Sequence, residues 1–301
     1  MAFEPPQRLV RALGEMPETA QDEDWLGQLP RLTEAALSRR GVRAQRVQAP
    51  GGRSSLVVLV TYADGTPAAL KLAPPHARPD RELAALAHWG GFGAVRILDT
   101  RHHEDDGALL LERLHPEVSL RSLPEAKALL EASGTLRRLW VAPPAGHVWE
   151  TVAERTGQQS GALRAAPAEV RALADTALAM RAELVAAPSE ELLLLHGNFR
   201  QGKVLAGERA PWLTVGPDPL VGERAYDLAR LVRDRLEDQV ASSAGAAGAR
   251  RRVNKLADAL EVDRDRLRGW TLFRAVESGN RALAAGRRRD AELLLEFAAW
   301  L

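Results

Sequence analysis

The feature that most restricts the fold of this chain is the order of three segments: a β-hairpin with a lysine, a helix with a glutamate, and a much later strand–loop–strand segment. An apolar, β-branched run over 56–62 predicts one strand, Asp64-Gly65 predicts a tight turn, and 67–72 predict a second strand with Lys71 near its end. Glu82 follows in the first turn of a helix predicted over 80–89. Taken singly, Lys71 and Glu82 indicate an exposed surface pair of little energetic worth.

A change of pattern near residue 114 predicts two parts. Before it lie a helix over 25–40, the hairpin, the helix over 80–89 and a strand pair over 94–99 and 108–112. After it lie helices over 124–140 and 167–185, short strands over 192–195 and 212–215, and helical periodicity from 226 onward. Residues 141–166 and 241–249 are expected to be connections, the second one mobile. We therefore predict an α+β fold with a small β-rich N-terminal lobe, 1–114, and a larger α-rich C-terminal lobe, 115–301.

Composition limits the partners. With 41 basic and 40 acidic residues, a net charge of +1 gives no overall field toward nucleic acid or an anionic membrane. The basic run Arg250, Arg251 and Arg252 lacks the aromatic residues that accompany single-strand binding. The sequence has no cysteine, no apolar stretch of membrane-spanning length and no apolar signal at its N-terminus. We expect a cytoplasmic protein without a nucleic-acid or membrane partner.

Two motifs near the later strands are the most specific in the chain. Residues 196–205 read His-Gly-Asn-Phe-Arg-Gln-Gly-Lys-Val-Leu, and 214–229 contain Thr-Val-Gly-Pro-Asp-Pro-Leu-Val-Gly and Tyr-Asp-Leu-Ala. Together they closely resemble the aminoglycoside phosphotransferase family, especially its streptomycin 6-kinase and hydroxyurea phosphotransferase branch. Members of that branch typically show His-Gly-Asp, an Asn five residues later, Ile-Asp-Pro, Pro-Leu-Val-Gly and Tyr-Asp-Leu-Ala. The resemblance covers nearly the whole chain, including 64–68 and 110–114. It implies the two-lobed protein-kinase-like fold and ATP-dependent phosphorylation of an antibiotic hydroxyl.

The resemblance also implies a nucleotide site. By position, Lys71 would hold the α- and β-phosphates of ATP, and Glu82 would orient Lys71. The backbone of Glu112, Arg113 and Leu114 would contact the adenine. A small polar molecule or a nucleotide is therefore the expected partner.

The chain departs from the family at the residues that perform its chemistry. The family's catalytic Asp falls on Asn198, its metal-binding Asn on Lys203 and its metal-binding Asp on Gly216. An amide cannot accept the proton of a hydroxyl, so a general-base contribution of typically ~10²–10⁴-fold is forfeited. Glycine offers no ligand and an ammonium repels a cation, so Mg²⁺ binding is expected to be weak or lost. Asp227, which supports the catalytic loop in this fold, is retained together with His196.

Other acidic and imidazole groups have two interpretations each. Asp218 lies two residues after Gly216, so in an extended segment it would point to the same side and could substitute as a metal ligand. We prefer a surface turn residue between two prolines. His102 and His103, beside acidic residues, indicate solvated surface more than a metal site. A cationic acceptor would require acidic groups of the helical lobe, and the candidates, which a solvated helix face also explains, are Glu261, Asp263, Asp265 and Glu277.

Three functions are open on this basis. The leading hypothesis is an inactive or severely impaired pseudo-phosphotransferase whose site binds a small polar molecule, a nucleotide without metal, or nothing. The second is an active ATP-dependent kinase of an aminoglycoside-like hydroxyl with a rearranged metal site. The third is a non-catalytic interaction protein. We favour the first because three functional groups change at once.

Overall fold

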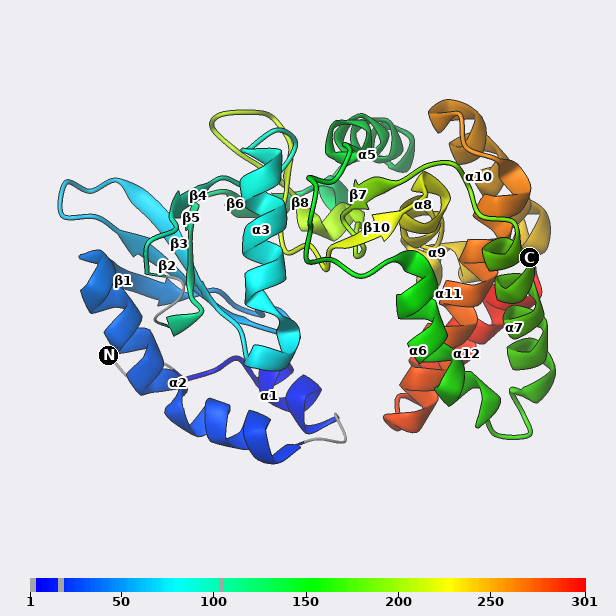
Figure 1. Cartoon of the computed structure of the whole chain (residues 1–301), viewed down its shortest axis with the longest axis horizontal. Helices are drawn as coiled ribbons and strands as arrows, with labels where there is room; N and C mark the ends of the chain where they lie inside the picture. The colour runs from blue at the N-terminus through cyan, green and yellow to red at the C-terminus, as the bar shows by residue number, and fades with distance from the viewer. Residues whose placement is uncertain (1–3, 16–18, 103–105) are drawn as a thin grey trace. The chain divides into compact units, whose positions relative to one another are not determined.

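The computed structural model describes residues 4–15, 19–102 and 106–301, and the chain divides into two compact units (Figure 1). Unit 1 runs to Ser119 and includes residues 205–215, whereas unit 2 comprises residues 120–204 and 216–301. The division therefore lies elsewhere than at Leu114. The reason is a small sheet of order β6-β8-β9, in which β6 (His115–Ser119) pairs antiparallel with β8 (Val204–Ala206). A strand partner about 90 residues distant leaves no local signal in the sequence.

Unit 1 contains a five-stranded sheet of order β1-β2-β3-β5-β4, in which neighbouring strands are antiparallel. The predicted hairpin is present, and its register pairs Val57 with Lys71. The strands are β1 (Arg43–Val47), β2 (Leu56–Thr61), β3 (Pro67–Leu72), β4 (Ile97–Asp99) and β5 (Leu109–Glu112), with β9 (Leu213–Thr214) in the smaller sheet. The helices are α1 (Gln7–Gly14), α2 (Thr19–Arg40) and α3 (Pro79–Trp89).

Alternation of side chains along the hairpin decides which face each residue occupies. Val58, Leu70 and Leu72 are buried in one hydrophobic core together with Leu29 of α2. Because successive side chains of a strand point to opposite faces, Lys71 lies on the other face of the sheet from its neighbours Leu70 and Leu72. The apolar core thus fixes the direction of the lysine.

Unit 2 is mainly helical and contains one two-stranded antiparallel sheet, β7 with β10. Its central helix is α11, which packs against α7, α8 and α12. Trp270 of α11 is buried, its indole N–H donates to Glu223 at 2.7 Å, and its ring meets the edge of Tyr226. The elements are α5 (Glu125–Leu139), α6 (Val152–Arg164), α7 (Arg171–Ala186), β7 (Leu193–Leu195), β10 (Leu220–Gly222), α8 (Arg224–Val232), α9 (Leu236–Ala241), α10 (Gly245–Leu260), α11 (Arg264–Ala284) and α12 (Arg288–Ala299).

The two expected connections were wrong in part. The segment 141–166 contains α6, which begins with a capping box in which Thr151 accepts from the N–H of Glu154 at 3.1 Å and donates its own N–H to that carboxylate at 2.7 Å. In the segment 241–249 the residues from Gly245 onward form the start of α10, so the connection between α9 and α10 is shorter than predicted and comprises residues 242–244. Arg252 at the expected solvated end is half-buried and forms an ion pair with Glu125.

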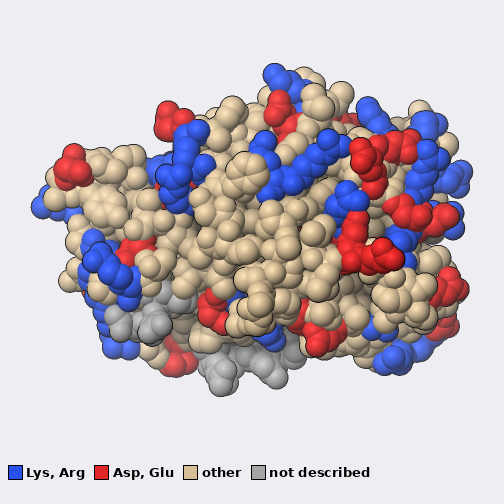
Figure 2. Space-filling view, turned by 45° about the horizontal axis from the view of Figure 1, so that its top comes forward, with Lys and Arg blue, Asp and Glu red and all other residues tan. Residues whose placement is uncertain are grey.

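Charges of both signs are interspersed on the face of the molecule drawn in Figure 2, as a net charge of +1 predicts. Among the helices of the described residues, none combines the length and the apolar character needed to cross a bilayer.

Truncation of Leu70 tests the core of unit 1. Leu70 is fully buried, so Leu70→Ala should lower the free energy of unfolding by about 2–5 kcal/mol, through lost transfer energy and the cavity left behind. Leu98→Ala in β4, where 40% of the side chain is exposed, is the control, expected to cost under about 1 kcal/mol. Urea unfolding followed by circular dichroism measures both. Similar losses for the two variants would contradict the assigned core.

Candidate functional site

Lys71 and Glu82 form an ion pair within unit 1. Lys71 extends from β3, and Glu82 lies in the first turn of α3. Their side chains are only 12% and 5% exposed, so the pair is shielded, unlike the surface pair that either residue alone indicates. The second carboxylate oxygen of Glu82, Oε1, is buried without a hydrogen-bond partner among the described residues, so this carboxylate acts on Lys71 alone. The result is an ammonium held in one position.

In the segment 112–114 the side chains of Glu112 and Arg113 have hydrogen-bond partners, whereas the peptide groups of Arg113 and Leu114 have none among the residues that the structure describes. The Glu112 carboxylate accepts from the N–H of Arg96 at 2.7 Å and pairs with Arg209 at 2.7 Å. The Arg113 guanidinium donates to the carbonyl of Ala68 at 2.8 Å. Within the described part of the chain, the N–H and C=O groups of Arg113 and Leu114 make no hydrogen bond. This backbone can therefore offer a donor and an acceptor to a planar ligand.

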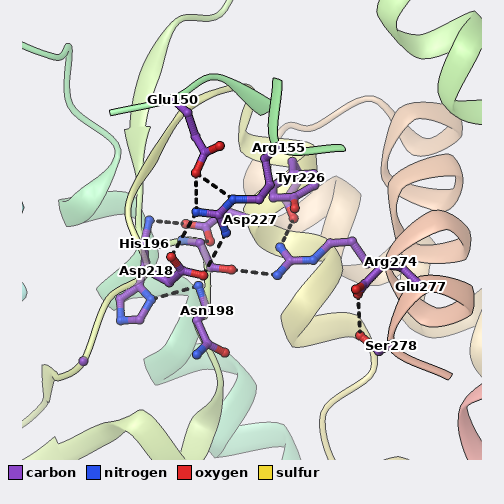
Figure 3. A network of polar contacts seen from close by, with 12 residues as sticks. Glu150, Arg155, His196, Asn198, Asp218, Tyr226, Asp227, Arg274, Glu277 and Ser278 are labelled. Carbon is purple, nitrogen blue, oxygen red and sulfur yellow. Dashed lines mark hydrogen bonds and ion pairs between the residues drawn. The ribbon is translucent and has the colours of Figure 1, made fainter. Parts of the chain in front are cut away.

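A buried carboxylate on α8 holds the polar loop that follows β7. Asp227 is fully buried and accepts hydrogen bonds from the N–H groups of His196 and Gly197, each at 2.9 Å (Figure 3). The indole N–H of Trp140 also donates to it at 3.3 Å. Burial raises the pKa of Asp227, while the charge of Arg274 and the donated hydrogen bonds oppose that shift. The carboxylate thus fixes the backbone at the start of the loop, where the resemblance assigned it a supporting role.

Arg274 of α11 holds the same loop from its carbonyl side, and sequence reasoning missed it. Its guanidinium donates to the carbonyl of Gly197 at 2.6 Å and to that of Tyr226 at 2.8 Å, and lies 4.3 Å from the Tyr226 ring centroid (Figure 3). The N–H of Asn198 donates to Nδ1 of His196 at 3.2 Å. The loop is therefore fixed by groups from several elements before any ligand binds. No local motif marks Arg274, because its partners lie on other elements.

The three residues at which the resemblance predicts the base and the metal ligands, Asn198, Lys203 and Gly216, do not fit a magnesium ion. Lys203 stands in a short 3₁₀ helix and its ammonium donates to the carbonyl oxygen of Gly216. Gly216 itself provides no side chain, which leaves the amide oxygen of Asn198 as the one side-chain oxygen of the three positions. Hard divalent cations require several oxygen ligands, and a neighbouring ammonium opposes them. The described residues also contain no cluster of three or more potential metal-binding side chains.

Asp218 is neither a free ligand nor a simple turn residue. Its carboxylate accepts two hydrogen bonds from the guanidinium of Arg155, at 2.8 and 3.0 Å, and Arg155 also pairs with Glu150 at 2.7 Å (Figure 3). The Asp218 side chain is 55% exposed, and the hydrogen bonds and charge of Arg155 outweigh its partial desolvation and hold its pKa below the ordinary value. A metal at Asp218 would have to displace a bidentate guanidinium. Arg155 was missed because α6 was missed, although Thr151 and Glu154 carry the signal of its start.

The four acidic candidates for a cationic acceptor lie in different places. Asp263 caps α11 by accepting from the N–H of Arg266 at 2.8 Å, which is a structural role. Glu261 lines a pocket of about 420 Å³ beside Trp140, and Asp265 lines a separate pocket of about 250 Å³. Glu277 lies on α11 close to Arg274 (Figure 3), and its carboxylate accepts hydrogen bonds from Ser278 and Arg281. The structure therefore assembles no acidic pocket from these four residues. His103 lies outside the described residues.

The sequence of the chain matches, over residues 40–286, the family described as aminoglycoside/hydroxyurea antibiotic resistance kinase. It is 36% identical over 277 residues to a streptomycin 6-kinase of Streptomyces glaucescens, covering 89% of this chain and 86% of the relative. It is also 36% identical over 290 residues to a hydroxyurea phosphotransferase of Kitasatospora aureofaciens, covering 92% and 82% of the two chains. The predicted resemblance is confirmed.

Solved structures share the fold at much lower identity. The aminoglycoside phosphotransferase APH(4)-Ia superposes with a TM-score of 0.62 at 14% identity, over 89% of this chain and 97% of that one. A choline kinase from Cryptosporidium parvum superposes with a TM-score of 0.58 at 10% identity, over 87% and 88%. At such identity the likeness concerns the fold alone, and it confirms the kinase-like fold class.

Two glycines with left-handed backbone test how tightly the loop is built. Gly197 has φ +71°, and a Cβ there would lie 1.9 Å from the carbonyl oxygen of Asp218. Gly216 has φ +60°, but its nearest contact would be the flexible end of Lys203 at 3.3 Å. Gly216→Ala should cost about 1–2 kcal/mol from backbone strain, and Gly197→Ala clearly more, because backbone must move. Chemical denaturation measures both free energies of unfolding, and equal costs would contradict the tight approach at Gly197.

Proposed function

The chain belongs to the aminoglycoside and hydroxyurea antibiotic resistance kinases, and from this premise we propose that it binds a nucleotide but has lost phosphotransferase activity or is severely impaired in it. The observation that carries the proposal is the contact between the Lys203 ammonium and the Gly216 carbonyl. This contact puts a fixed positive charge where the family's two metal ligands fall.

The chemistry of phosphoryl transfer makes the metal positions decisive. The transition state spreads charge over the transferred group, so catalysis consists mainly of positioning and of charge stabilisation by metal ions. An ammonium can bind phosphate as a point charge, but it cannot bridge two phosphate groups and coordinate the incoming oxygen as a divalent ion does. Asn198 can orient a hydroxyl by hydrogen bonding without accepting its proton. Binding is therefore expected to survive where turnover does not.

The nucleotide-binding part of the proposal rests on unit 1. The shielded Lys71–Glu82 pair supplies an oriented cation for phosphates. The unbonded peptide groups of Arg113 and Leu114 supply hydrogen-bonding positions for a base. Both features support a nucleotide as the ligand, with ATP as the family's nucleotide.

An active kinase is the second candidate function, favoured by two observations. The relatives that are 36% identical over most of the chain are named as a kinase and as a phosphotransferase. The loop backbone at His196 and Gly197 is also held firmly by Asp227, as turnover would require. In this alternative Asp218 must leave Arg155 to bind the metal. Robust Mg²⁺-dependent phosphate transfer by the purified protein, abolished by Lys71→Ala, would establish it.

Magnesium dependence of nucleotide binding tests the proposal. ATP should raise the melting temperature of the full chain equally with Mg²⁺ and with a chelator, because lysines rather than a metal screen the phosphates. Lys71→Ala should remove most of the rise. Thermal unfolding with saturating ATP measures this, and Arg250→Gln, at an exposed arginine of α10, is the control.

Each deviation from this result has a defined meaning. Mg²⁺ could instead greatly enlarge the ATP-induced rise in melting temperature, and Asp218→Ala could remove that enlargement. This result would identify Asp218 as the metal ligand and would support the active kinase. Absence of a shift under both conditions contradicts nucleotide binding and favours the interaction protein.

Restoration of the family's residues provides a second prediction. The triple variant Asn198→Asp, Lys203→Asn, Gly216→Asp should bind ATP more tightly with Mg²⁺ than with a chelator, since it regains oxygen ligands. Asp is tolerated in left-handed backbone better than most residues, so φ +60° at Gly216 permits this change. Calorimetric titration with and without Mg²⁺ measures the gain. Equal affinities in the triple variant would show that these positions do not form the metal site.

A further inference from the structure

Two helices of unit 2 that pack against each other, α8 and α11, present arginines to a common region. Arg230 lies in the last turn of α8, and Arg233 follows three positions later as the residue that caps the C-terminus of this helix. On α11, Arg274, Glu277 and Arg281 follow at spacings of three and four, which places them on one face. The N–H of the Arg233 guanidinium donates to the backbone carbonyl of Arg274 at 2.9 Å, so the end of α8 contacts α11.

The partners of these arginines differ. Both terminal nitrogens of the Arg274 guanidinium donate hydrogen bonds to backbone carbonyls, one to Tyr226 and the other to Gly197. Arg233 is buried, and its Nε has no hydrogen-bond partner among the described residues. Arg281 has a long contact of 3.4 Å with Glu277 and is 67% exposed. The cluster therefore includes guanidiniums with unused donors.

Arg230 is the most unusual member of the cluster. It is half-buried, yet in the described part of the chain its side chain has neither a hydrogen bond nor an ion pair. Its pKa is lowered to about 10, first by desolvation and then by the charge of Arg200, with Asp234 opposing. A guanidinium with that pKa still carries its full charge at neutral pH. The guanidinium is partly exposed and lacks a partner among the described residues, so an added anion can reach it and pair with it.

The balance of charge in the cluster favours an anion. Four guanidiniums, those of residues 230, 233, 274 and 281, have two carboxylates near them, those of Asp234 and Glu277. Desolvation lowers the pKa of Arg233 well below its ordinary value, and the charges of Arg230 and Arg274 lower it further. The carboxylate oxygens of Asp234 accept hydrogen bonds from the backbone N–H groups of Gln201, at 2.5 Å, and Arg235, at 3.2 Å. Asp234 is thus oriented by the backbone and gives Arg230 no hydrogen bond.

We propose that Arg230, with Arg233 and Arg281, forms a binding site for an oxyanion, specifically the phosphate group of a small phosphorylated molecule. Guanidinium forks match the spacing of phosphate oxygens and form paired, charge-assisted hydrogen bonds with them. The site adjoins the catalytic-type loop, because Arg274 of the same helix face binds the carbonyl of Gly197. The inference goes beyond the proposed nucleotide binding and holds whether or not the chain transfers phosphate.

The arginine cluster also disfavours the cationic acceptor for which the acidic residues of the helical lobe were candidates. A polycationic acceptor at this site would require free carboxylates there, yet Glu277 already accepts from Arg281. Repulsion between guanidiniums and a polycation disfavours such an acceptor. The ligand proposed for this site is accordingly anionic.

Binding of inorganic phosphate and of a hexose monophosphate to the full chain tests the site. In calorimetry at matched ionic strength, wild-type protein should bind both, and the hexose monophosphate more tightly than inorganic phosphate, because the proposed ligand is a small phosphorylated molecule. Arg230→Gln should weaken phosphate binding by about tenfold or more, because bonds between charged groups are lost. Arg230→Lys should fall between the two. The matched control Arg250→Gln, which removes an exposed arginine of α10, should leave the affinity unchanged.

Two further readouts separate this site from a structural role and from the nucleotide site. Without phosphate, Arg230→Gln should melt no lower than wild type, because an unpaired desolvated charge does not stabilise the fold. Lys71→Ala removes the phosphate-binding lysine of the nucleotide site, so the phosphate binding that remains in this variant should be the binding that Arg230→Gln weakens. A lower melting temperature for Arg230→Gln, equal weakening by Arg230→Gln and Arg250→Gln, or loss of phosphate binding in Lys71→Ala would each overturn the proposal.

Discussion

Asp227 accepts hydrogen bonds from two consecutive backbone N–H groups, those of His196 and Gly197, from a fully buried position on α8. Burying a carboxylate is costly unless its oxygens are bonded, and here two amides and an indole bond them while Arg274 supplies the opposite charge. Because these contacts involve the backbone of the loop, they do not depend on the side chain at position 198. The loop can keep its geometry while its chemistry changes.

The same loop is surrounded by fixed cations. Lys203 binds the Gly216 carbonyl, Arg155 binds Asp218, and Arg274 binds the Gly197 carbonyl. In a metal-dependent phosphotransferase, much of the positive charge comes from ions that arrive with the nucleotide. Here it comes from side chains that are part of the fold. The Gly216 carbonyl and the Asp218 carboxylate, at and beside the predicted metal position, already have cationic partners.

Sequence reasoning succeeded where the signal was local or periodic and failed where partners were distant. The hairpin and α3 follow from alternation and turn residues, so the meeting of Lys71 and Glu82 could be predicted. Arg155 could have been found, since the capping box before it is a local signal. Arg230 and Arg274 could not, because their significance depends on the packing of α8 against α11. The boundary between the units depends likewise on the pairing of β6 with β8, which no short pattern encodes.

Replacing an exchangeable metal by fixed side chains alters catalysis more than binding. Catalysis requires interactions that strengthen between the ground state and the transition state. A metal can adjust its coordination as the phosphoryl group moves, whereas the Lys203 ammonium is held by the Gly216 carbonyl and attracts the phosphates of substrate and product alike. Uniform attraction of this kind lowers the free energy of every bound state without lowering the barrier between them. Under the proposed function, the residues at the three loop positions would therefore favour retention of a nucleotide over its turnover, and the proposed oxyanion site of Arg230, Arg233 and Arg281 would extend this preference to other anions.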